Sequence, residues 1–388
     1  MVHYAHKPAI LALLGAIGIL YVILHSTYTR PIALTIATYN GTAAVFENNA
    51  TSAFESIKIE NWKVFELSPN KGEADSETIL LSLASTYKNP SDKHASFRIF
   101  VDIGANVGRT SQKIISFVTD NTCRVDEATN FELGNIKRHQ NCENDKQELI
   151  LAFEPAEANF DVLTKKSLLK KWDGASWVGI QAAVGDTDEN ATFYTSGIAG
   201  DEQSSLDAEA ASIDDAPRTY NARKISLDYL FQNGYEISGL ITPNATRSAF
   251  FDEIIPNKTN TNAVDRWDIF LLKIDTEGYD YYVIRGASQL LATRRVKFLV
   301  FEYNSKWFSQ GRNTTLQSVV HDLLEVNYTC FWILNTDLVP MSGKMWIESY
   351  ETASWSNVMC GAIGDLDVKR VVNGFNVNII VEWKLLGF

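Results

Sequence analysis

Five strongly apolar runs recur along the middle of the sequence, and segments with helical spacing separate them. The runs occupy residues 97–103, 149–153, 176–184, 269–274 and 296–301. Near-continuous apolar runs that alternate with helices are typical of parallel strands buried on both faces. We therefore predict an α/β fold with a mostly parallel sheet and helices on both of its faces. Strands near 328–334 and 356–362 would complete the core.

An acidic residue stands at or just after the carboxyl end of every one of these runs. The acids are Asp102, Glu154, Asp186, Asp275 and Glu302. Ligands of open α/β sheets bind beyond the carboxyl ends of the strands, at the point where the strand order reverses. Acids scattered over a surface would not follow the strand ends in this way. The sequence therefore predicts a functional site at this edge of the sheet.

The first two strand ends indicate a cofactor that contains adenosine. Gly104 and Gly108 allow a sharp turn that a ligand can approach, and Glu154 can accept both hydroxyls of a ribose. The dinucleotide fingerprint G-x-G-x-x-G is not matched, because Asn106 occupies its third position. Asp102 would disfavour an anionic pyrophosphate and would suit a nearby cation, such as the ammonium or sulfonium of S-adenosylmethionine.

Six short segments follow one another in a recognisable order between residues 97 and 304. They read VDIGANVGRTS at 101–111, FEP at 153–155, AAVGD at 182–186, ISLD at 225–228, LLKIDTEGYDYYVIRGA at 271–287 and LVFEYN at 299–304. This series resembles the FkbM family of S-adenosylmethionine-dependent methyltransferases. The resemblance implies a Rossmann-like sheet and methyl transfer to a hydroxyl, often of a sugar or polyketide. It also implies cofactor contacts from Asp102, Gly104, Asn106, Gly108, Glu154 and Pro155.

The fourth run carries the residues to which we assign the reaction. Lys273 lies in an apolar strand and needs a carboxylate partner, which would be Asp102 or Asp275. We predict Asp275 as the base that positions the acceptor hydroxyl, with Glu277 and Glu302 as further catalytic candidates. An ordinary carboxylate is a weak base for an alcohol, so alignment of the hydroxyl with the methyl group would supply much of the rate. The alternative is that Lys273 and Asp275 only fix the strand ends.

No metal ion is part of this prediction. The alternative is that Asp275, Glu277 and Glu302 hold Mg²⁺ or Ca²⁺, since both ions prefer oxygen ligands. No spacing of cysteine and histidine residues indicates zinc.

Residues 8–24 carry no charge and have the length of a short membrane span. Positive charge precedes this segment at Lys7, which favours a cytoplasmic N-terminus and a lumenal body. A cleaved signal peptide is the alternative. We predict a cytoplasmic tail at 1–7, a signal anchor at 8–24, a lumenal stem at 25–75 and a catalytic domain at 76–388 with insertions near 121–148 and 232–266.

Sequons and cysteines agree with a lumenal body. The N-x-[ST] pattern occurs at Asn40, Asn49, Asn190, Asn244, Asn257, Asn313 and Asn327. Of the three possible disulfide connectivities we favour the local pairing Cys123–Cys142 and Cys330–Cys360, with four free thiols as the alternative. We therefore expect a single-pass type II membrane protein of the endoplasmic reticulum or Golgi. A lumenal site points to an acceptor hydroxyl on a glycan, and a net charge of −12 argues against nucleic acid as a partner.

Other classes of protein stay open at this point. A type II lumenal glycosyltransferase could use Asp186 and Asp188 as a D-x-D metal-nucleotide site, although a glycan on Asn190 would crowd it. A nicotinamide oxidoreductase is disfavoured by the altered glycine spacing. A non-catalytic glycan-binding module on the same fold would bind no cofactor.

Overall fold

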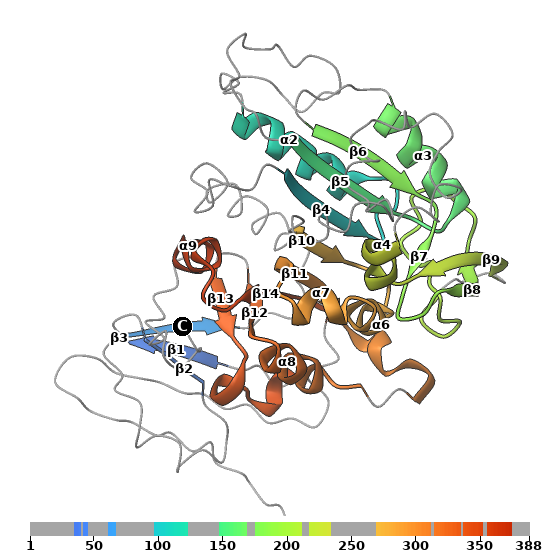
Figure 1. The fold of residues 1–388 in the computed structure, drawn as a ribbon. Helices are drawn as coiled ribbons and strands as arrows, with labels where there is room; N and C mark the ends of the chain where they lie inside the picture. The colour runs from blue at the N-terminus through green and yellow to red at the C-terminus, as the bar shows by residue number, and fades with distance from the viewer. Residues whose placement is uncertain are drawn as a thin grey trace, which may run out of the picture. The chain divides into compact units, whose positions relative to one another are not determined.

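The computed structural model describes the chain in several segments (Figure 1). They are residues 35–39, 42–45, 61–66, 97–122, 147–168, 175–211, 217–233, 269–311, 314–334, 337–351 and 355–374. The chain forms two compact units, and the smaller one includes Met1–Ser68. Its described strands are β1 (Thr35–Tyr39), β2 (Thr42–Val45) and β3 (Asn61–Glu66), which form an antiparallel sheet in the order β2-β1-β3. These strands fall within residues 25–75, the segment predicted to be a lumenal stem.

Several sequence predictions fall on other parts of the chain. The tail at 1–7, the anchor at 8–24 and the pair Cys123–Cys142 lie outside the described residues, as does most of both insertions. Within the described segments, no helix combines the length and the apolar character needed to cross a membrane.

An eight-stranded sheet forms the centre of the larger unit, in the order β13-β12-β14-β11-β10-β4-β5-β6. Its strands are β4 (Phe97–Ile103), β5 (Gln147–Phe153), β6 (Ala175–Ile180), β10 (Ile269–Ile274), β11 (Val296–Tyr303), β12 (Tyr328–Leu334), β13 (Asp337–Pro340) and β14 (Ser356–Ala362). Neighbours from β11 to β6 pair in parallel, whereas β14 is antiparallel to β11 and β12. β13 is antiparallel to β12 and begins three positions after the end of that strand. The predicted α/β class is confirmed, and the sheet is mixed.

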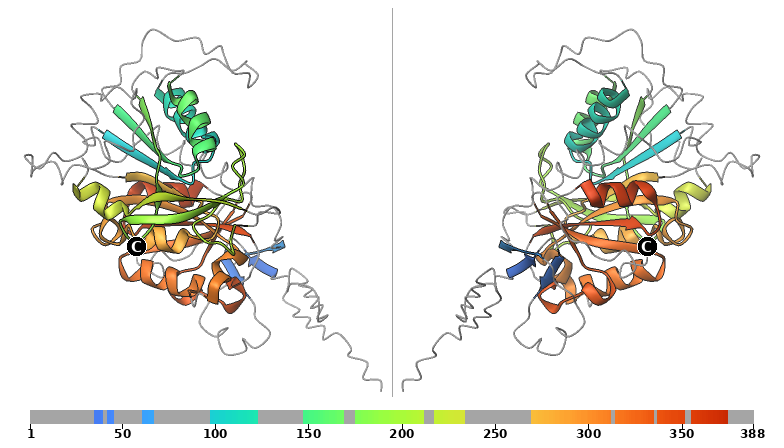
Figure 2. Two further views of the ribbon diagram at one scale, coloured as in Figure 1. Left: turned by 90° about the vertical axis from the view of Figure 1, so that its right-hand side faces the viewer. Right: turned by 90° about the vertical axis from the view of Figure 1, so that its left-hand side faces the viewer.

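Five helices described in the larger unit follow strands of the parallel part of the sheet. α2 (Arg109–Thr122) and α3 (Glu157–Leu168) follow β4 and β5, while α6 (Asp280–Arg285), α7 (Ser288–Ala292) and α8 (Leu316–Glu325) follow β10 and β11. Right-handed crossovers place the two groups on opposite faces, because the strand order grows in opposite directions from the β4–β10 boundary. The two groups can be followed in Figure 2. The central strand β10 is buried on both sides of the sheet. Lys273 is the one residue of this strand that is not fully buried.

A smaller sheet adjoins the third predicted strand. It contains β7 (Ala183–Val184), β8 (Glu189–Thr195) and β9 (Arg218–Ile225) in the order β7-β9-β8, and α4 (Leu227–Asn233) follows it. The prediction of one continuous strand over 176–184 was wrong. A tight turn in which the Ala182 N–H donates to the Ile180 carbonyl ends β6, and the chain then enters the small sheet.

The pair Cys330–Cys360 forms a disulfide, which confirms that half of the predicted pairing. The two cysteines lie directly opposite each other on β12 and β14. The backbone of Cys330 bonds on its other side, to Ser342 Oγ and the Met341 N–H. The two cysteines therefore form a non-hydrogen-bonded cross-strand pair, and the closer approach of strands at such pairs allows a direct bridge.

Candidate functional site

A cavity of about 880 Å³ opens at the carboxyl ends of the central strands. From β4 the chain proceeds to β5 on one side, and β10 with β11 lies on the other, so the β4–β10 boundary is a topological switch point. Glu154, Asp275 and Glu302 line this cavity, as the strand-end prediction expects. Asp102 lies buried behind the wall, and Asp186 does not line the cavity.

The turn after β4 depends on left-handed backbone. Gly104, Asn106 and Gly108 have φ values of 74°, 50° and 76°. A Cβ on Gly104 would lie 1.7 Å from the carbonyl oxygen of Asp275, and one on Gly108 would lie 2.9 Å from Trp177. The glycines therefore let the turn pack against the end of β10 and against β6. Gly104 and Asn106 line the cavity, whereas Gly108 does not.

Asn106 connects this turn to Glu154 at the end of β5. The Asn106 N–H donates to Glu154 Oε2 and the Ala156 N–H donates to Oε1, both at 2.8 Å. Burial raises the pKa of Glu154 to about 7, although these two hydrogen bonds act in the opposite direction. Glu154 and Pro155 both reach the cavity wall. The carboxylate predicted to accept ribose hydroxyls is thus held in a fixed orientation by backbone donors.

Lys273 on β10 forms ion pairs with Asp102 on β4 and with Asp275 just after β10. Its Nζ lies 3.0 Å from Asp275 Oδ2 and 3.4 Å from Asp102 Oδ1, so both partners considered from the sequence are present. Ser111 Oγ donates to Asp102 Oδ2 at 2.6 Å. Burial by itself lowers the pKa of Lys273, but the two carboxylates outweigh it and hold the pKa above its usual value. Asp102 is fully buried and does not line the cavity, and its carboxylate contacts Ser111 and Lys273 instead.

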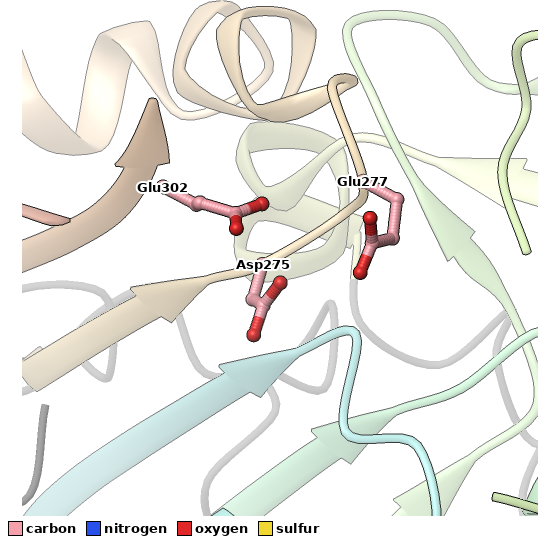
Figure 3. A group of neighbouring side chains, drawn as sticks. All are labelled: Asp275, Glu277 and Glu302. Carbon is pink, nitrogen blue, oxygen red and sulfur yellow. The ribbon is translucent and has the colours of Figure 1, made fainter. Parts of the chain in front are cut away.

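Three predicted catalytic carboxylates meet at the ends of β10 and β11. Asp275, Glu277 and Glu302 each offer an oxygen, and these oxygens lie within 4.8 Å of one another (Figure 3). Glu277 follows β10 with a left-handed φ of 55°, and Lys306 contacts its Oε2. Glu302 is 6% exposed, whereas the side chain of Asp275 is 42% exposed. The arrangement gives the cavity one strongly acidic wall.

A fourth carboxylate lies behind this wall. Asp280 is fully buried and accepts hydrogen bonds from Thr276 Oγ1 at 3.0 Å and from the Glu302 N–H at 3.2 Å. Burial raises the pKa of Asp280 and of Glu277 to about 7, and the charge of Asp275 adds to both shifts. Burial also raises the pKa of Glu302 well above its usual range. Low solvation and mutual repulsion therefore make ionisation of Glu277, Asp280 and Glu302 costly.

The chain matches a known family of protein domains across this site. The sequence profile of the Methyltransferase FkbM domain matches residues 102–328, more than half of the chain. The chain belongs to the FkbM methyltransferase family. The match spans every predicted site residue from Asp102 to Glu302, which confirms the resemblance drawn from the motifs.

Comparisons with individual proteins add less. No curated protein sequence matches the chain. A crystal structure of methyltransferase FkbM from Methylobacillus flagellatus KT is similar over 71% of this chain and 47% of that chain, with 11% sequence identity and a TM-score of 0.34. The chain therefore spans about half the length of that protein.

The FkbM domain also places residues in the cavity that sequence reasoning missed. Asn159, in the first turn of α3, accepts from the Gly200 N–H at 2.7 Å, and Asn106 Nδ2 donates to the Asp201 carbonyl at 3.0 Å. Lys306 lies in the 3-10 turn η4 (Ser305–Gly311), shortly after β11. The positions of Asn159 and Lys306 just beyond strand ends could have identified them. Asp201 lies in an Asp- and Ser-containing loop that carries no such signal.

The D-x-D pair is committed to other contacts in the FkbM domain. Asp188 accepts hydrogen bonds from the Ser226 N–H and Oγ, both at 3.1 Å. Asp186 pairs with Arg285 at 3.5 Å. Neither residue lines the cavity described above. These contacts leave the glycosyltransferase alternative without structural support.

Proposed function

We propose that this FkbM domain is an S-adenosylmethionine-dependent methyltransferase that methylates a hydroxyl group of a glycan or glycoconjugate. The observation that carries the proposal is a single cavity with two different walls. One wall contains the Gly104–Gly108 turn and the fixed carboxylate of Glu154, and the other contains Asp275, Glu277 and Glu302. A cavity of this volume is in the range of small-molecule and cofactor sites.

The residues present fit S-adenosylmethionine better than an anionic dinucleotide. The acids that line the cavity outnumber the basic residues by six to four; they are Glu154, Asp201, Glu202, Asp275, Glu277 and Glu302, against Arg109, Lys113, Lys273 and Lys306. When bound, the cofactor supplies a methyl group on a sulfonium. Glu154 would accept ribose hydroxyls, while Gly104 and Asn106 would lie along the cofactor. Three of the basic residues, Arg109, Lys273 and Lys306, are already paired with carboxylates, which further disfavours a pyrophosphate.

The acidic wall supplies groups that can orient a hydroxyl. Asp275 is the most exposed of its three carboxylates, and Lys273 fixes its Oδ2. We assign Asp275 the hydrogen bond to the acceptor hydroxyl and the acceptance of its proton, with Glu277 and Glu302 beside it. Orientation of the hydroxyl toward the methyl group would contribute much of the rate, since carboxylates as a class are weak bases for an alcohol.

The location and the class of acceptor rest on separate observations. The uncharged segment at 8–24 and the seven sequons support a lumenal domain on a type II anchor in the endoplasmic reticulum or Golgi. Two of the sequon asparagines, Asn190 and Asn327, are exposed. The disulfide Cys330–Cys360 supports an oxidising compartment. Glycans are the hydroxyl-rich acceptors that such a compartment offers.

Methyl transfer tests the proposal directly. Purified full-length protein is incubated with methyl-labelled S-adenosylmethionine and glycans released from cells, and label in the glycan fraction is measured after mild base treatment, which hydrolyses methyl esters. We expect base-stable label, as an ether requires. Label that base removes would indicate carboxyl methylation, and label on no acceptor would contradict the assigned activity.

A further inference from the structure

Glu302 places a buried carboxylate oxygen in the acidic wall. Glu302 is 6% exposed, and its Oε2 is fully buried without a hydrogen-bond partner among the described residues. Figure 3 shows its carboxylate directed toward the space between Asp275 and Glu277. Burial of a carboxylate without a partner is costly, so such groups are normally neutralised, paired or bound to a metal ion.

Among the described residues, the two lysines that contact carboxylates of this wall do not offset its charge. Lys273 is shared between Asp102 and Asp275, and Lys306 contacts Glu277. With all groups ionised, five carboxylates face two lysines; the carboxylates are Asp102, Asp275, Glu277, Asp280 and Glu302. Either protons or a further cation must balance the excess.

The spacing of the ligand oxygens agrees with a divalent cation. The three oxygens of Asp275, Glu277 and Glu302 lie within 4.8 Å of one another. Two oxygens on opposite sides of a Ca²⁺ ion are separated by about 4.6 to 5.2 Å, and the separation is about 4.2 Å for Mg²⁺. These separations are compatible with ligands of one Ca²⁺ ion, and Mg²⁺ would require the oxygens to lie closer together. We propose that Asp275, Glu277 and Glu302 bind one divalent cation on the wall of the cavity.

The site itself does not depend on methyl transfer, but its use does, and that part rests on the proposed function. Carboxylate ligands leave positions on a hard cation open to water or to a substrate oxygen. An acceptor hydroxyl bound there would lose its proton more easily, so that a carboxylate oxygen of Asp275 not bound to the cation could take it. This would remove the difficulty that a carboxylate alone is a weak base for an alcohol.

Binding of Mn²⁺ to the full-length protein tests the site without any activity measurement. Mn²⁺ is titrated by calorimetry and by electron paramagnetic resonance into the metal-free wild type, Glu302→Gln and the control Glu325→Gln, a carboxylate exposed on α8. We expect one Mn²⁺ site in the wild type and in the control. In Glu302→Gln the Mn²⁺ affinity should be at least about tenfold weaker. Absence of Mn²⁺ binding by the wild type, or equal affinity in Glu302→Gln, would overturn the proposal.

A second variant guards against misfolding of the first. Asp275 is partly exposed, so Asp275→Asn should fold even if Glu302→Gln does not, and it should weaken Mn²⁺ binding similarly. Unchanged affinity in folded Asp275→Asn would likewise reject the site.

Binding of S-adenosylmethionine in the presence of EDTA is measured in parallel. Mn²⁺ binding without binding of S-adenosylmethionine would support the cation site and reject the proposed function. Binding of S-adenosylmethionine without Mn²⁺ binding would reject the cation site and leave the proposed function standing.

Discussion

Lys273 on β10 lies directly opposite Asp102 on β4, with its Nζ 3.4 Å from Asp102 Oδ1. Both residues are largely or fully buried at the switch point of the sheet, beneath the turn that begins at Gly104. The pair therefore connects the two halves of the parallel sheet at the position where the site is built.

Removal of the lysine should destabilise the fold. Lys273→Met would leave Asp102 as a buried charge without its cation, and the free energy of unfolding should fall by about 3 kcal/mol or more. Urea unfolding measures this, with Lys344→Met at an exposed position of the 3-10 turn η5 (Gly343–Met345) as the control. Adding Asp102→Asn to the variant should restore most of the loss. A change below about 0.5 kcal/mol in Lys273→Met would show that the pair is not structurally important.

The turn at Gly104 should not tolerate a methyl group. In Gly104→Ala the new Cβ would collide with the Asp275 carbonyl in addition to adopting an unfavourable positive φ. We expect a clear loss of stability and weaker binding of S-adenosylmethionine.

Gly364→Ala provides the matched control for that experiment. Gly364 has a φ of 85°, and the nearest atom to its Cβ would be 3.9 Å away, so only the backbone penalty of about 1 to 2 kcal/mol applies. Thermal unfolding compares the two variants. Equal losses would mean that the close approach to Asp275 is unimportant.

Glu154 should make stability depend on pH in a defined direction. Its pKa of about 7 in the folded protein is above the value of 4.5 expected when unfolded. The folded chain therefore retains a proton that the unfolded chain loses, and the free energy of unfolding falls as the pH rises from about 4.5 to 7.

The size of this effect follows from the shift. Between pH 5 and pH 8 the contribution of Glu154 should decrease by about 2 to 3 kcal/mol. The difference in unfolding free energy between the wild type and Glu154→Gln isolates it, because other buried carboxylates are common to both. A difference independent of pH would show that Glu154 is not protonated near neutrality.

Asp275→Asn should separate binding from turnover. The variant keeps the shape of the side chain but loses the carboxylate that we assign to the acceptor hydroxyl. We expect methyl transfer to fall by at least about 100-fold while the affinity for S-adenosylmethionine changes little. Turnover close to that of the wild type would remove Asp275 from the reaction.

Much of this architecture follows from local sequence patterns. The runs that became β4, β5, β10 and β11 are largely apolar because both faces of these strands are buried, and their acidic ends meet because parallel strands end at one edge. A pairing of Lys273 with Asp102 or Asp275 could also be anticipated, since a buried lysine requires a carboxylate.

Other features depend on contacts that the sequence does not display. Gly104 is required by the carbonyl oxygen of Asp275, which is distant along the chain. Asp201 reaches the cavity only because Asn106 and Asn159 hold its loop. The direction of β14 and the division of the third predicted strand are likewise set by tertiary pairing.

Calorimetric titration of S-adenosylmethionine into the wild-type protein and into Glu154→Ala tests the central claim most directly. We predict saturable binding of one cofactor per chain, at least about tenfold weaker in Glu154→Ala because the ribose would lose its acceptor, and no binding of NAD⁺. Absence of S-adenosylmethionine binding by the folded wild-type protein, or binding that Glu154→Ala leaves unchanged, would contradict the assignment of this cavity as the cofactor site.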